Sequence, residues 1–251
     1  MATGFRRALA LFVASALPVV AMAADLTVSA AASLTNAFRE LGPLFEAANP
    51  GTRVQLNFGS SGGLLQQIAK GAPADVFASA DQETMDQAQK QGLVQTSQRR
   101  NFVSNALMVI VPATAANVPG AVTDLAGPAY ARIAIGLPAS VPVGRYTKSV
   151  LEAANLWGAI EPKMIGANNV RQALDYVARA EVDAGFVYAT DAALMPDKVR
   201  GALTVPATRP ILYPVAPLAA APNAPMAQRF VEFLASPAAQ AVLARYGFGK
   251  P

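Results

Sequence analysis

The segment Gly59-Ser60-Ser61-Gly62-Gly63 has the G-x-S-x-G spacing of a serine hydrolase. A nucleophilic serine needs a base that takes its proton, and in that motif the base is histidine. The chain of 251 residues contains no histidine and no cysteine, and the S-x-x-K spacing of a serine–lysine pair is missing at Ser61. Zinc also prefers histidine and cysteine ligands. We therefore expect no catalytic residue and no bare metal-ion site, with a serine-dependent hydrolase as a distant alternative.

The position of this loop between a strand and a helix indicates anion binding instead. The run RVQLNF (53–58) predicts a strand, and Leu64, Leu65 and Ile68 have the apolar spacing of a short helix. The first N–H groups of a helix have no intrahelical acceptor, and together with the helix dipole they attract anions. Ser61 adds a hydroxyl there, and glycines let the backbone come close to a ligand.

A second loop has the same design. The run LTVSA (26–30) predicts a buried strand, three alanines follow it, and Ser33 precedes a helix with apolar residues at Leu34, Phe38 and Leu41. In open α/β sheets, ligands bind at the carboxyl ends of the strands. Two small serine-bearing turns at that edge favour one ligand site more strongly than either turn does alone.

The second half of the chain offers further donors. The segment SVPVGRYTKSV (140–150) is a Pro/Gly loop that opens a helix. In ANNVRQAL, Asn168 or Asn169 can cap a helix, which leaves the N–H of Val170 free in the first turn. Tyr188 ends a strand, where its hydroxyl can donate to a ligand; a tyrosine at the edge of the core is the alternative.

Two cations and one carboxylate lie beside these segments. We expect Arg145 and Lys148 to be solvated helix residues, with attraction of anions to the mouth of the site as the alternative. Asp191 comes three residues after Tyr188, where we expect it to brace the loop.

Strand and helix patterns alternate along the chain, which predicts an α/β protein. The two last helical segments have no partner in the middle of the chain, so we expect them to return to the first half. This predicts two lobes, one built from residues 24–103 plus 212–251 and the other from 104–211. Two hinge crossings, near Ser104 and Ile211, would join them.

The first 23 residues predict a cleaved signal peptide. Arg6 and Arg7 precede an apolar core, and Ala21-Met22-Ala23 is a cleavage pattern; a retained membrane anchor is the weaker alternative because Pro18 lies in that core. Without these two arginines the charge is 18 − 16 = +2, with no basic cluster for nucleic acid. Since no cysteine can carry a lipid, we expect a soluble periplasmic protein and not a lipoprotein.

In this order, SAAASLTNAF, FGSSGGL, GAPADVFASAD, VPVGRYTKSVLE, NNVRQAL and AGFVYATDA resemble the periplasmic molybdate-binding proteins of molybdate ABC importers. The resemblance covers essentially the whole chain after residue 23. It implies a type II periplasmic binding protein fold, in which two lobes, each a mixed sheet flanked by helices, close on an oxyanion. It further implies a monomeric, non-enzymatic receptor without a cofactor, which delivers molybdate or tungstate to an inner-membrane ABC permease.

The resemblance also implies which residues bind the oxyanion: Ser33, Ser61, Val143, Val170 and Tyr188. Gly62 stands where many relatives have a third serine, so that position offers no hydroxyl. Molybdate is a proton-free dianion and accepts hydrogen bonds only, whereas hydrogen phosphate would favour an added carboxylate acceptor. A sulfate-type receptor stays an alternative, because only cavity size would separate the two ions. An organic-acid or polyamine receptor would need an arginine or paired carboxylates, which the matched loops lack.

Overall fold

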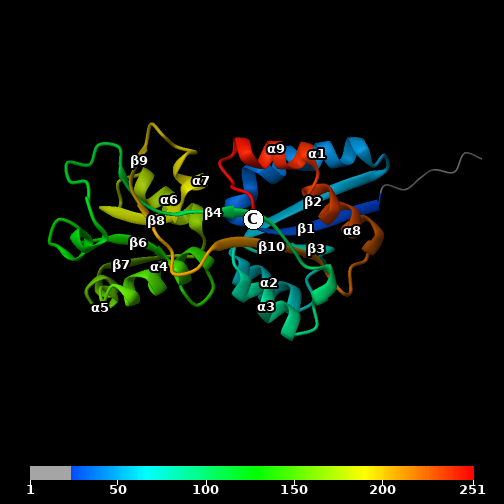
Figure 1. Ribbon diagram of the computed structural model, residues 1–251, viewed down its shortest axis with the longest axis horizontal. Helices are drawn as coiled ribbons and strands as arrows, with labels where there is room; N and C mark the ends of the chain where they lie inside the picture. The colour runs from blue at the N-terminus through cyan, green and yellow to red at the C-terminus, as the bar shows by residue number, and fades with distance from the viewer. Residues whose placement is uncertain (1–23) are drawn as a thin grey trace, which may run out of the picture.

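The computed structural model describes residues 24–251, so the predicted signal peptide (1–23) lies outside the described residues. Two five-stranded mixed sheets form two lobes within that range (Figure 1). The sheet of lobe 1 has the order β2-β1-β3-β10-β4. Its strands are β1 (Ala24–Ala31), β2 (Thr52–Gly59), β3 (Val76–Ala78), β4 (Arg100–Asn105) and β10 (Ile211–Pro217). Strand β1 is parallel to β2 and β3, whereas β10 is antiparallel to β3 and β4.

Helices cover both faces of this sheet (Figure 1). One face carries α1 (Thr35–Ala48), α8 (Ala224–Leu234) and α9 (Pro237–Arg245), and the other carries α2 (Ser61–Ala69) and α3 (Gln82–Lys90). Two short 3₁₀ helices, η1 (Ala32–Leu34) and η2 (Thr96–Gln98), complete lobe 1. Phe45 of α1 and Phe230 of α8 pack edge to face with their ring centres 5.1 Å apart, a favourable aromatic geometry that helps to hold the C-terminal helices on lobe 1.

Lobe 2 has the sheet order β7-β6-β8-β5-β9. Its strands are β5 (Leu107–Pro112), β6 (Ile133–Gly136), β7 (Met164–Ala167), β8 (Ala184–Tyr188) and β9 (Val199–Val205). Its helices are α4 (Pro142–Ala153), α5 (Trp157–Ile160), α6 (Val170–Ala178), α7 (Ala189–Ala192), η3 (Val122–Ala126) and η4 (Glu161–Lys163). Strand β6 is parallel to β7 and β8, and β5 is antiparallel to β8 and β9. The predicted α/β architecture of two mixed sheets flanked by helices is confirmed.

The chain passes between the sheets twice, and the two passages lie side by side. The first is the step from β4 to β5, where only Ala106 separates the strands, and the second is the segment 206–210 between β9 and β10. Asn105 pairs with Ile211 in the first sheet, and Leu107 pairs with Val205 in the second. Two adjacent crossings of this kind allow the lobes to move as rigid bodies about a hinge.

Burial follows the sequence periodicity. In α6 the buried residues Val170, Ala173, Leu174 and Val177 recur every three or four positions, which turns one apolar stripe toward β8. Among the described residues, the helices are too short or too polar to traverse a lipid bilayer.

Candidate functional site

All five predicted site residues line a single cavity between the lobes. Ser33 and Ser61 come from lobe 1, and Val143, Val170 and Tyr188 come from lobe 2. The remaining lining residues are Ala31, Ala32, Gly59, Ser60, Ala80, Val141, Pro142 and Asn169. The cavity has about 10 Å³ of space for the centre of a water-sized sphere, so in this closed arrangement the lobes enclose about the space of a single water molecule. No lining side chain carries a charge.

Strand register explains why these residues meet. Ala31 at the end of β1 pairs with Gly59 at the end of β2, so the loops that follow start side by side. In lobe 2, Gly136 at the end of β6 pairs with Ala167 at the end of β7 in the same way. Four strand-to-helix turns, two from each lobe, therefore converge on the cavity.

Each of these turns opens a helix whose first N–H groups lack an intrahelical acceptor. Ser61 and Val170 are the first residues of α2 and α6, and Ser33 is the second residue of η1. In α4 the first residue, Pro142, has no N–H, so Val143 supplies the first amide of that helix. Unpaired amides and helix dipoles directed at one point form a site for an anion.

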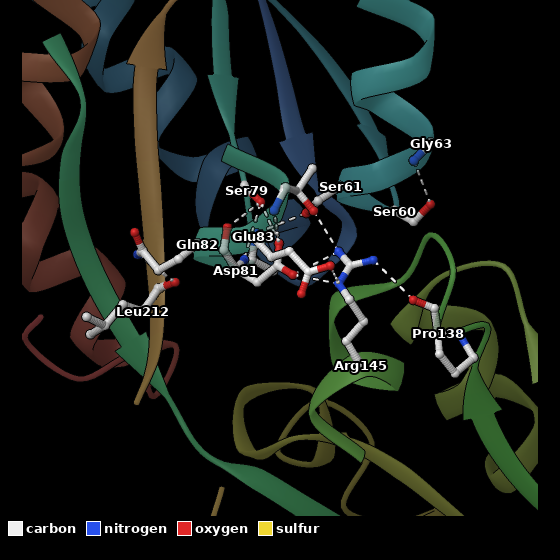
Figure 2. A network of polar contacts seen from close by, with 12 residues as sticks. Ser60, Ser61, Gly63, Ser79, Asp81, Gln82, Glu83, Pro138, Arg145 and Leu212 are labelled. Atoms are coloured by element: carbon white, nitrogen blue, oxygen red, sulfur yellow. Dashed lines mark hydrogen bonds and ion pairs between the residues drawn. The ribbon is translucent and has the colours of Figure 1, made fainter. Parts of the chain in front are cut away.

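The two serines of the 59–63 loop have different roles (Figure 2). The Oγ of Ser60 accepts a hydrogen bond of 3.3 Å from the N–H of Gly63 and caps α2. The Oγ of Ser61, which is fully buried, accepts one of 3.0 Å from the N–H of Ala80. A backbone N–H cannot take a proton from a serine, so Ser61 has no activating base there. Its own hydroxyl hydrogen stays available to a ligand in the cavity.

Tyr188 is a buried, neutral donor. Its hydroxyl lies 3.5 Å from the carbonyl oxygen of Ala80, the long limit of a hydrogen bond, so the hydrogen can turn to a better acceptor. Burial, followed by the neighbouring Tyr213 and Tyr146 and the carboxylates Asp81 and Asp191, raises the pKa of Tyr188 well above its ordinary value. The phenol therefore keeps its proton at neutral pH and can donate a hydrogen bond to a ligand.

Arg145 of α4 crosses from lobe 2 to lobe 1, and its interpretation as a solvated helix residue is wrong (Figure 2). Its Nε donates to Asp81 Oδ2 at 2.8 Å, and Nη2 donates to Thr84 Oγ1 at 2.6 Å. Asp81 is fully buried and also caps α3 by accepting from the N–H of Thr84 at 3.2 Å. The arginine therefore compensates a carboxylate that would otherwise be buried without a partner. Lys148, by contrast, is partly exposed, and its Nζ lies 5.3 Å from the ring centre of Trp157.

Arg171 of α6 makes a second bridge behind Ser33. Its Nε donates to Asp191 Oδ1 at 2.6 Å, Nη1 donates to Asn36 Oδ1 at 2.7 Å, and Nη2 donates to the carbonyl of Ser33 at 3.1 Å. Burial raises the pKa of Asp191 to about 6, because the loss of solvent outweighs the opposing effect of Arg171. The ion pair holds Asp191 beside the first turn of α6 and joins that turn to the Ser33 loop.

Both arginine bridges link residues that are distant in sequence, so the spacing of residues could not predict them. Within residues 24–251, the acidic side chains form no group of three or more that could hold a metal ion. The chemistry available at the cavity is thus hydrogen-bond donation by neutral groups, surrounded by compensated ion pairs.

The fold and the site define the class: a two-lobed α/β binding protein with a small donor-lined cavity between its lobes. The chain belongs to the family of bacterial extracellular solute-binding proteins, whose family model matches residues 26–249. It is similar to the molybdate-binding protein ModA of Escherichia coli, at 36% identity over 230 residues that cover 89% of this chain and 88% of the relative. ModA of Haemophilus influenzae is 34% identical over 235 residues, 91% of each chain.

A solved structure is also similar. The periplasmic molybdate-binding protein of Azotobacter vinelandii matches with a TM-score of 0.80 at 27% identity, over 90% of this chain and 99% of that one. These relatives confirm the predicted resemblance to molybdate-binding proteins and the two-lobed fold that it implies.

Proposed function

We propose that this protein captures molybdate between its two lobes and delivers it to an ABC importer. The observation that carries the proposal is the cavity between Ser33 and Ser61 of one lobe and Val143, Val170 and Tyr188 of the other. Its polar groups are uncharged hydroxyls and backbone amides at helix N-termini, which suit a dianion that only accepts hydrogen bonds. The ModA relatives support the same ligand.

About seven donors are available to the ion: the hydroxyls of Ser33, Ser61 and Tyr188, and the amides of Ser33, Ser61, Val143 and Val170. A hydrogen bond to a charged partner contributes about 1.5–3 kcal/mol, so seven give about 10–20 kcal/mol before the costs of association. That amount is sufficient for tight binding without a cation in the cavity. Since no side chain there is a nucleophile with a base, the proposed role is binding and not catalysis.

The lining also favours some oxyanions over others. Hydrogen phosphate carries a proton that needs an acceptor, and the cavity has no carboxylate in its lining. Tungstate has nearly the size and the charge of molybdate, so we propose that it binds as well. Sulfate has the same charge and is smaller, and a sulfate-type receptor is the second candidate.

The proposal includes a location and a partner. The predicted signal peptide and the family support a protein that works in the periplasm. The lack of cysteine, the residue that would carry a lipid, supports a protein without a lipid anchor, and we propose that it works as a monomer. The partner would be an inner-membrane permease that recognises the closed form.

Equilibrium calorimetry of the chain without residues 1–23 tests the function. We expect one molybdate per chain, tungstate binding of similar strength, weaker sulfate binding and no competition by phosphate. Absence of both heat and a thermal shift with molybdate would refute the proposal, and stronger binding of sulfate would favour the second candidate.

A further inference from the structure

The hydroxyl of Ser33 has a hydrogen-bond partner outside the cavity, and this partner determines whether the hydroxyl can donate to a ligand inside the cavity. Ser33 Oγ lies 2.9 Å from the hydroxyl oxygen of Tyr213 on β10, and distance alone allows either group to be the donor. Both residues are buried, Tyr213 completely. Tyr213 does not line the cavity. It lies beside the cavity, because its ring packs edge to face on that of the lining residue Tyr188, with the ring centres 5.7 Å apart.

A third residue resolves the direction. The side-chain amide of Asn105 must turn its oxygen to the N–H of Ala106, which donates to it at 2.9 Å. Its nitrogen then donates to Thr190 Oγ1 at 2.9 Å and to the hydroxyl oxygen of Tyr213 at 3.2 Å. Tyr213 is therefore an acceptor toward Asn105.

The hydrogen of Tyr213 has one acceptor among the described residues, Ser33 Oγ. Burial raises the pKa of Tyr213 well above its ordinary value, so the phenol retains this hydrogen at neutral pH. If Ser33 donated instead, the phenol hydrogen would be buried without an acceptor, which costs about 1–3 kcal/mol. Ser33 Oγ thus accepts from Tyr213, and its own hydrogen is directed to the cavity.

We propose that Asn105 and Tyr213 are positioning residues, which orient the Ser33 hydroxyl as a hydrogen-bond donor for the bound oxyanion. The inference rests on the proposed function and deepens it. Donors arranged in series also polarise one another, which strengthens the last hydrogen bond in the chain. A hydroxyl that is held as a donor favours proton-free anions over those that must donate a proton.

The location of Asn105 adds a second property to this hydrogen-bond relay, which runs from Asn105 through Tyr213 to Ser33. Asn105 is the last residue of β4 at the first crossing, and it contacts Thr190 of lobe 2 as well as Tyr213 of lobe 1. Figure 1 shows β4 and β10 side by side where the chain leaves lobe 1. The orientation of Ser33 is thus connected to the hinge.

A double-mutant cycle with molybdate calorimetry tests the relay. In the protein that keeps Ser33, Tyr213→Phe should weaken molybdate binding by about three- to tenfold, the value of one neutral hydrogen bond. In the Ser33→Ala background the same change should have almost no effect, because no hydroxyl is left to orient. Tyr246→Phe removes a hydroxyl that donates to Glu40 and takes no part in the hydrogen bonds among Asn105, Tyr213 and Ser33, so it is the matched control and should leave binding unchanged.

Equal losses from Tyr213→Phe in both backgrounds would assign Tyr213 a structural role and overturn the inference, as would no loss in either. Failure of the unaltered protein to bind molybdate would overturn the proposed function instead, and the relay with it. Asn105→Asp gives a second cycle that does not depend on the folding of Tyr213→Phe. The carboxylate would accept a hydrogen bond from Tyr213 and reverse the relay, so the loss of molybdate affinity should again depend on the presence of Ser33. Simple repulsion between the new charge and the anion would instead weaken binding equally in both backgrounds.

Discussion

The N–H of Gly62 donates a hydrogen bond of 3.0 Å to the carbonyl of Ser140, which joins the first turn of α2 in lobe 1 to the loop before α4 in lobe 2. A Cβ at Gly62 would lie 2.6 Å from that carbonyl oxygen and 2.9 Å from the Cα of Ser140. The closed arrangement of the lobes therefore requires glycine at this position of this chain.

Gly62→Ala should weaken molybdate binding by about tenfold or more, because the lobes cannot approach without a clash. The unfolding temperature of the free protein should not fall, since alanine favours the helix more than glycine does. Calorimetry and thermal unfolding measure the two effects. Gly158→Ala is the control, because its Cβ would meet no atom within 4 Å. Unchanged affinity in Gly62→Ala would show that this contact is not needed for binding.

Arg145→Met should speed the release of molybdate and weaken binding by about ten- to a hundredfold. In the closed form the change leaves Asp81 buried without its cation, whereas in an open form water can solvate that carboxylate. Stopped-flow measurement of dissociation checks this. Lys148→Met, on the exposed side of the same helix, should have little effect. Equal losses in the two variants would indicate long-range attraction of the anion and not a bridge between lobes.

Ser33→Ala and Ser61→Ala should each weaken binding by about ten- to a hundredfold, since each removes one hydrogen bond to a charged ligand. Ser60→Ala is the informative comparison. It removes the cap of α2 and should cost about 1 kcal/mol of stability, with a smaller effect on affinity. Titration calorimetry and chemical unfolding of the three variants separate these outcomes. A loss of affinity in Ser60→Ala as large as in Ser61→Ala would contradict the division of roles.

Asp191 should make stability depend on pH between about 4 and 6. Its folded pKa of about 6 lies above the ordinary value of 3.8, so in this window the folded protein binds more protons than the unfolded chain. Its contribution is greatest below pH 3.8, is lost as the pH rises through 6, and amounts to about 3 kcal/mol. The unfolding free energy of the unaltered protein minus that of Asp191→Asn should fall over this range and stay level above it. A difference that rises with pH would mean that Arg171 lowers the pKa below its ordinary value.

Local patterns predicted a large part of the fold and the convergence of the site. Ser61 and Val170 follow strands and begin amphipathic helices, so their free amides could be expected from helix chemistry alone. The resemblance added Val143, whose backbone contribution no side-chain pattern reveals. The alternation of strands and helices likewise indicated two α/β lobes, because it depends on local periodicity.

The contacts around the cavity could not be predicted in this way. Arg145 has the spacing of a surface residue on α4, and only the other lobe supplies its partner Asp81, 64 positions earlier. Tyr213 lies in an apolar strand, so its sequence context predicts a core residue, whereas its hydroxyl forms a hydrogen bond with Ser33, 180 positions away. The available signal was weak: a polar residue, Asn105, at the start of an apolar run, and a tyrosine within another.

A crystal structure of the molybdate complex, with the anomalous signal of molybdenum, tests the central claim most directly. We predict one molybdenum peak in the cavity, with oxygens about 2.6–3.2 Å from the hydroxyls of Ser33, Ser61 and Tyr188 and from the amides of Val143 and Val170. An ion clamped by the guanidinium of Arg145 or Arg171, or bound away from the two serine loops, would contradict a cage of neutral donors.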